Sequence, residues 1–189
     1  METMIGRVKG MLLEPRATWK EIDTEFTKSG EVWGKFILPL AAIGPIATTV
    51  GMILFGRRVP LTSLTTPVSI TTAISTGIAA YVLGLLSVFV LSRVISLLAP
   101  GFGGQRNDVQ ALKAAAYSST AAWIGGVAQL LPALSLVSIL FSLYSLVLLY
   151  LGLSIVMKVP KDRAMGYTAV VIIVSIVVYL IAGAIVTAF

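Results

Sequence analysis

The sequence predicts an all-α integral membrane protein, in which five transmembrane helices follow short amphipathic N-terminal helices. The chain is 57% hydrophobic and 12% charged, with a mean hydropathy of +0.97. These are too few polar groups to cover a soluble globule. A helix crosses the hydrocarbon core in about 20 apolar residues. Segments of about this length cover residues 36–55, 73–92, 114–131, 133–157 and 166–187.

The first 35 residues are predicted to form a cytoplasmic amphipathic segment, and residues 36–189 a five-helix transmembrane domain. Before the first span, apolar residues recur at helical spacing in two short runs separated by Pro15, a residue that suits the first turn of a helix. The segment carries six basic and six acidic residues. Binding to lipid would therefore depend on apolar contact, and we expect Pro15, Trp19 and Ile22 to anchor it at the membrane surface. A partner-docking arm is the alternative.

Proline residues interrupt the first span. Pro39 and the pair Gly44-Pro45 remove backbone donors and should bend the helix. The bend would serve either as a mobile gate or as a shape that packs.

Spans two, three and four each align small side chains along one helical face. In lipid, small residues let backbones approach closely, and serine hydroxyls can bond across the seam. A serine stripe on span four could instead line a hydrated path. The positions for helix packing or a polar path are Gly77, Gly84, Ser118, Gly125, Ser135, Ser138, Ser142, Ser145 and Gly152.

The chemistry of the chain gives no sign of an enzyme. It has no Cys and no His, and no Asp or Glu falls within a predicted span. Thiol chemistry, the usual zinc ligands and carboxylate relays are therefore not expected, nor is a cofactor. The net charge of +6 is explained by membrane orientation rather than by nucleic-acid binding. Arg93, near the end of span two, is either interfacial or functional.

The distribution of Lys and Arg predicts the orientation. Twelve of these residues fall on the side of the N-terminus and two on the other. We expect a cytoplasmic N-terminus and an outer C-terminus. The segment KVPKDRA, between spans four and five, then faces the cytoplasm as a topology anchor or a contact for an acidic partner or lipid headgroups. The candidate contact residues are Lys158, Lys161, Arg163 and Arg106.

Three stretches resemble the Yip family of five-span membrane proteins, named for interaction with Rab-type GTPases, and most closely its prokaryotic branch. They are LLEPRATWKEI, AAAYSSTAAWIGGVAQLLPAL and LYSLVLLYLGLSIVMKVPKDRAMGY. Besides Pro15, Trp19, Ile22 and Gly152, the family-like positions are Tyr117, Pro132, Tyr144, Leu151, Ala164 and Tyr167.

The resemblance implies a non-enzymatic adaptor or organiser in membrane homeostasis or trafficking-like processes. It would sit in a prokaryotic cytoplasmic membrane, contact the lipid bilayer, and bind a protein partner on its cytoplasmic face or further copies of itself. Two alternatives stay open: a small transporter or channel with a solute path along the serine-bearing face of span four, and a lipid-handling protein.

Overall fold

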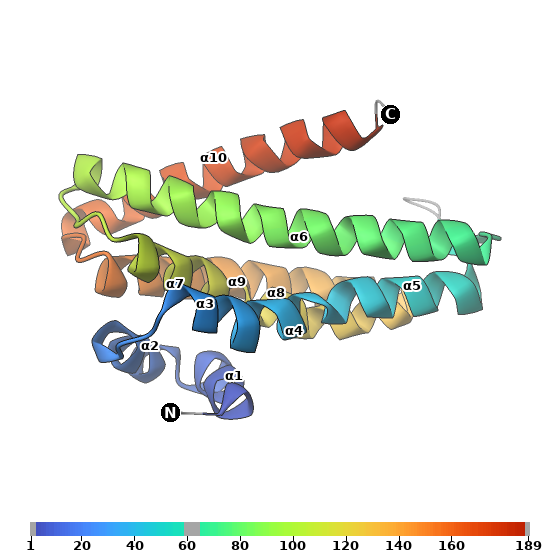
Figure 1. The fold of residues 1–189 in the computed structure, drawn as a ribbon, viewed down its shortest axis with the longest axis horizontal. Helices are drawn as coiled ribbons and strands as arrows, with labels where there is room; N and C mark the ends of the chain where they lie inside the picture. The colour runs from blue at the N-terminus through green and yellow to red at the C-terminus, as the bar shows by residue number, and fades with distance from the viewer. Residues whose placement is uncertain (1–2, 59–64, 188–189) are drawn as a thin grey trace.

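The computed structural model describes residues 3–58 and 65–187, and shows a bundle of long helices with a smaller helical pair beside it (Figure 1). Among the described residues, three helices are long and apolar enough to cross a membrane: Ser29–Phe55, Ile70–Phe102 and Leu136–Val156. Outside the described part lie the side chains of Arg58, Thr65, Pro132, Ser135, Val178, Tyr179 and residues 181–187.

The N-terminal pair consists of α1 (Met4–Leu13) and α2 (Pro15–Thr24). The Thr3 side chain caps α1 by accepting a hydrogen bond from the Gly6 N–H at 3.1 Å. Pro15 begins α2, where its missing N–H would have no helical partner. The two amphipathic helices predicted for this region are therefore present.

The first long helix is continuous but irregular. It begins before the expected position 36 and runs through α3 (Ser29–Val32), the π-helical turn η1 (Trp33–Ile37), α4 (Leu38–Ala41) and α5 (Ile43–Phe55). The irregular turns lie just before Pro39 and Pro45, as expected from the helical bonds that their missing N–H groups remove.

A short hairpin follows, in which β1 (Arg57–Arg58) pairs antiparallel with β2 (Thr65–Thr66). Gly56 enters it with a φ of +79°, and a Cβ at this position would stand 2.5 Å from the Thr66 carbonyl oxygen. Only glycine fits such a position without strain.

The second long helix, α6 (Ile70–Leu98), outlasts the expected span 73–92 and continues into the 3-10 turn η2 (Ala99–Phe102). At its start, the Ser69 hydroxyl accepts a hydrogen bond from the Thr72 N–H.

The third predicted span is broken, which corrects the expectation of one continuous helix over 114–131. The chain forms α7 (Asp108–Ser118), α8 (Thr120–Gly125) and two 3-10 turns, η3 (Gly126–Leu130) and η4 (Pro132–Leu134). At the break between α7 and α8, the hydroxyls of Ser119 and Thr120 donate to the carbonyls of Ala115 and Tyr117. Such hydroxyls compete with the backbone ladder.

Two further long helices complete the bundle: α9 (Ser135–Val156) and α10 (Lys161–Thr187). The sequence predicted KVPKDRA as a polar turn, but the turn is limited to residues 157–160, because Lys161, Asp162 and Arg163 already belong to α10. The α10 helix contacts both α6 and α9.

The bundle has two unlike ends (Figure 1). At the charged end, as we name it, lie α1, α2, the 99–107 segment with the start of α7, and the 157–163 segment. The hairpin, η4 and the last turns of α10 lie at the opposite end. The charged end therefore brings together three segments that are far apart in the sequence.

Candidate functional site

At the charged end, α2 docks onto α7 and α9 through fully buried side chains. Trp19 and Ile22 are both 0% exposed. The indole of Trp19 lies against Gly152 of α9, where an added Cβ would stand 2.5 Å from the ring atom Cζ2. The sequence predicted that these side chains anchor the chain at the membrane surface, but the structure places them inside the protein. The reason is that Gly152 of α9 has no side chain and leaves room for the indole ring.

Tyr117 of α7 is the centre of an aromatic cluster beneath α1 and α2. Its ring makes edge contacts with Trp19 and Phe36, with centroid distances of 6.4 Å and 4.6 Å. The Arg7 guanidinium lies 5.7 Å from the ring centroid and also pairs with Glu25 at 2.7 Å. Arg7 is 6% exposed, so this charge is buried with both its carboxylate and its ring partner.

Lys113 of α7 holds the end of α2. Its side chain is 1% exposed, and its Nζ donates to the carbonyl oxygens of Ile22 at 3.0 Å and Glu25 at 2.5 Å. A cation suits a helix C-terminus, where carbonyls lack helical partners. Burial lowers the pKa of Lys113, and nearby Arg7 adds to this, whereas Glu25 and Asp23 oppose it.

Two more contacts reach the N-terminal pair from α9 and the segment after it. The Tyr144 hydroxyl donates to the Leu12 carbonyl at 3.1 Å, and the Lys158 ammonium forms an ion pair with Asp23. Lys158 has a φ of +55°, a left-handed conformation that non-glycine residues rarely adopt. The candidate contact residue Lys158 is therefore committed to a contact within the protein.

The other three candidate contact residues remain on the surface, and we call Arg106, Lys161 and Arg163 the cation surface. All three are exposed. Their supporting segments are fixed to each other, since the Gln105 N–H donates to the Met157 carbonyl at 2.9 Å. The Arg163 Nε lies 3.9 Å from the Asp162 carboxylate. Arg106 and Lys161 form no ion pair within the described residues.

The last turns of α6 are tied to the same end. Arg93 is exposed and pairs with Asp108 at 3.0 Å, and the Ser96 hydroxyl donates to the same carboxylate at 2.5 Å. The Ser96 hydrogen bond is the main reason that the pKa of Asp108 is lowered. Ala164 is 1% exposed, and the Tyr167 hydroxyl donates to the Ile95 carbonyl at 2.5 Å. These family-like residues thus join α10 to α6.

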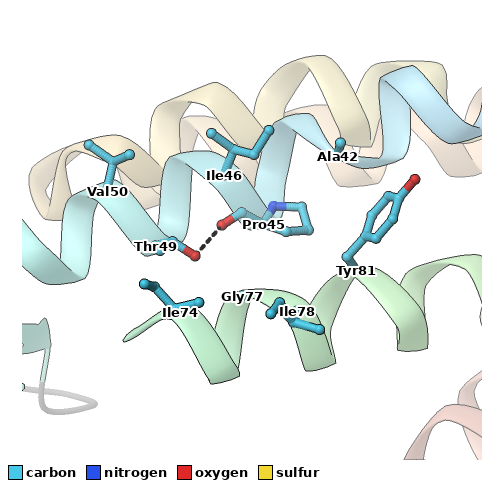
Figure 2. A pocket seen from close by; sticks show the side chains of 9 residues that line it. All are labelled: Ala42, Pro45, Ile46, Thr49, Val50, Ile74, Gly77, Ile78 and Tyr81. Carbon is cyan, nitrogen blue, oxygen red and sulfur yellow. Dashed lines mark hydrogen bonds between the residues drawn. The ribbon is translucent and has the colours of Figure 1, made fainter. Parts of the chain in front are cut away.

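Several of the predicted glycines pack against a neighbouring helix, whereas a Cβ at Gly84 would meet none that the structure describes. Gly77 of α6 contacts the Thr49 side chain of α5, beside a groove of about 340 Å³ that Pro45 and Tyr81 also line (Figure 2). Gly125 contacts Phe141 of α9. Gly126, which was not singled out, meets Gly44 so closely that a Cβ would stand 2.8 Å from the Gly44 Cα.

The serines of the predicted stripe bond to backbone. The Ser138 hydroxyl donates to the Gly125 carbonyl at 2.9 Å, and the Ser145 hydroxyl accepts from the Ala122 N–H at 2.9 Å, which supplies a partner for the first turn of α8. The Ser142 and Ser118 hydroxyls donate within their own helices. The side chains of Pro132 and Ser135 fall outside the described part.

A cavity of about 780 Å³ lies between α6, α8, α9 and α10, and we call it the serine cavity. Each serine that lines it donates its proton to a backbone carbonyl within 3 Å. The serines are Ser87, Ser119, Ser138, Ser142 and Ser175. The cavity wall is otherwise mostly Leu, Ile and Val, together with Gly84, Trp123 and Gln129. In the described residues, no group of three or more His, Cys, Asp or Glu could hold a metal ion.

Sequence reasoning missed Lys113, Arg7 and Asp23, which fix the N-terminal pair. A signal was present at Lys113, a single lysine directly before the run AAA at the start of the third predicted span. Such a lysine must find a partner if its helix is buried on all sides.

Comparison with protein families gives one finding. The model described as the Yip1 domain matches residues 9–183, a range that begins in α1 and ends in α10. Searches among curated proteins and among solved structures return no match.

Proposed function

The chain belongs to the Yip1 family and is an integral membrane protein in contact with the lipid bilayer, and on this premise we propose that it is a non-enzymatic adaptor or organiser. In this proposal the chain crosses a prokaryotic cytoplasmic membrane five times, and its charged end faces the cytoplasm. The excess of Lys and Arg at that end supports the orientation.

The observation that carries the proposal is the cation surface. Arg106 and Lys161 are exposed on segments whose backbones are bonded together, so both side chains project from backbone positions that are fixed relative to each other. Exposed cations on a fixed backbone favour recognition of an acidic surface, because the backbone needs no ordering on binding. The partner we propose is a protein with an acidic face at the membrane.

The experiment is crosslinking in native membranes at native expression level, followed by mass spectrometry. The test variant is Arg106→Glu/Lys161→Glu/Arg163→Glu. Lys158 is left unchanged because it pairs with Asp23 of α2. Reversing its charge would loosen α2, and this effect could not be told apart from the loss of a partner.

A matched control reverses three other exposed cations of the N-terminal pair, Lys9→Glu/Arg16→Glu/Lys20→Glu. Both variants change the charge equally at the same end of the bundle. A crosslinked partner that is lost only in the test variant supports the adaptor. A partner that both variants retain, or the absence of any partner in the wild type, rejects the cation surface as an adaptor site.

The serine cavity favours lipid handling as a second candidate function. The serine hydroxyls already donate their protons to backbone carbonyls. This favours an apolar occupant such as a lipid chain over a hydrated solute path. Lipid-flip and solute-flux assays in liposomes separate the two, and lipid movement without solute flux is the expected result.

A further inference from the structure

We propose that the serine cavity is a binding site for one hydrocarbon chain of a membrane lipid. This inference does not depend on the adaptor role. It deepens the lipid-handling candidate, but it concerns occupancy and requires no movement of lipid between leaflets.

The size and walls of the serine cavity fit a hydrocarbon chain. Its volume of about 780 Å³ falls within the range of about 300–1,000 Å³ that is typical of small-ligand sites. The long apolar helices α6 and α9 supply Leu91, Leu143 and Leu146, and α10 supplies Ile172 and Ile176. An occupant would therefore be surrounded largely by aliphatic carbon.

The serine hydroxyls have no proton left to donate to an occupant of the cavity. Ser87, Ser142 and Ser175 donate to carbonyls of their own helices at 2.8, 2.8 and 2.6 Å, and Ser119 and Ser138 donate at 2.8 and 2.9 Å. The hydroxyls thus offer an occupant only acceptor lone pairs. An ordered water needs two to four polar partners, whereas a hydrocarbon chain needs none.

The arrangement of α6 and α10 gives a chain a way in. The two helices separate toward the end of α10 (Figure 1), and both contribute walls to the cavity. On the α10 side, Ile176 and Leu180 line the cavity and remain 53% and 63% exposed. A lipid chain can therefore enter sideways from the bilayer without the protein opening.

The position of the Gln129 amide gives the direction that we propose for the chain. Gln129 belongs to η3, near the opposite end of the bundle, whereas Leu91 and Leu149 lie toward the charged end. We place the polar head of the lipid beside Gln129, at the opposite end, and the methyl terminus near Leu91.

Trp123 provides the test, because its indole lines the serine cavity. The protein is placed in nanodiscs of phosphatidylcholine with brominated acyl chains, which quench nearby tryptophan. The quenching lost in Trp123→Phe gives the share due to Trp123. We expect Gly84→Phe to lower the quenching of the otherwise unchanged protein to the level of Trp123→Phe. Apart from its chain neighbours and the nearby backbone of α6, no heavy atom of the described residues lies within 4 Å of a Cβ at Gly84, so the new ring has open space to enter.

A second variant and a control make the outcome decisive. Ser175→Phe fills the cavity from α10 and should lower the quenching equally. Ala79→Phe places the same ring on exposed α6 surface outside the lining and should keep wild-type quenching. Wild-type quenching in both filled variants, or no quenching of Trp123 at all, overturns the proposal. Native mass spectrometry of protein in mild detergent should show one retained phospholipid in Ala79→Phe, and none in the filled variants.

Discussion

The contact between Trp19 and Gly152 predicts that a single methyl group will loosen the N-terminal pair. In Gly152→Ala, the new carbon would stand 2.5, 2.7 and 2.7 Å from the indole atoms Cζ2, Cε2 and Cη2. Carbon atoms pack at about 3.5–4.0 Å. The ring must therefore retreat by about 1 Å, and with it α2.

The magnitude follows from the cost of overpacking. Inserting a methyl group into a filled site costs about 1–3 kcal/mol, and here the strain disappears when α2 leaves α9. The ratio of docked to undocked chains should therefore fall by about 5- to 150-fold. The higher helix propensity of alanine does not offset this loss, because α9 is helical in both states.

Amide hydrogen exchange in nanodiscs measures the effect. Peptides from α1 and α2 should exchange faster by that factor, while peptides from α6 keep their protection. Gly166→Ala is the matched control. It lies in α10 at the same end, and its Cβ would make an ordinary 3.7 Å contact with Phe102.

A double-mutant cycle identifies the cause. Trp19→Phe removes Cζ2 and Cη2, so Gly152→Ala should cost less in that background, with a coupling energy of about 0.5–3 kcal/mol. Unchanged exchange of α2 in Gly152→Ala, or strictly additive effects in the cycle, would refute the reasoning.

Three other contacts give predictions of their own. Burial lowers the pKa of Lys113 below its ordinary value of 10.5, so undocking of α2 takes up protons at alkaline pH below 10.5. Docking of α2 should therefore tighten as the pH rises toward 10.5, which is measured as protection of α2 from proteolysis. Lys113→Met should remove this pH dependence. Lys158→Ala should raise the rate of amide exchange in α2 by up to about fivefold, and by less at high salt, because the half-exposed ion pair with Asp23 contributes roughly 0–1 kcal/mol. The control Lys161→Ala should leave the exchange rate of α2 unchanged. Ser145→Ala should destabilise the fold by about 1–3 kcal/mol and lower its Tm, because the Ala122 N–H loses its hydrogen-bond partner. The control Ser142→Ala loses only a hydrogen bond within α9 and should keep a Tm near that of the wild type.

Local backbone chemistry was readable from the sequence. Pro39 and Pro45 predicted where the first long helix becomes irregular, because the missing N–H of each proline leaves the carbonyl four residues earlier without its helical partner, whatever the surroundings. Pro15 predicted the start of α2 in the same way. The five-span layout stays a prediction, since three described helices meet the length and composition for a crossing.

Contacts between distant segments were not readable. The amphipathic pattern around Trp19 shows that one face of α2 avoids water, but a bilayer and a protein groove satisfy that face equally. Whether α2 packs against the bilayer or against the protein depends on Gly152, more than a hundred positions later in the sequence. The break in the third predicted span likewise depends on hydroxyls at Ser119 and Thr120, which a hydropathy window reads as ordinary helix.

The docking of α2 also has a consequence for the order of events during synthesis. The hydrogen bond to Lys113 spans 91 residues and the ion pair to Lys158 spans 135. At about 5–20 residues per second, α2 waits roughly 7–27 s for its last partner to be made. During that time the apolar face formed by Trp19 and Ile22 cannot pack against α9. It must instead be covered by lipid or by a chaperone. The helices α1 and α2 can therefore be fixed in place only after α9 and the segment that follows it have been made.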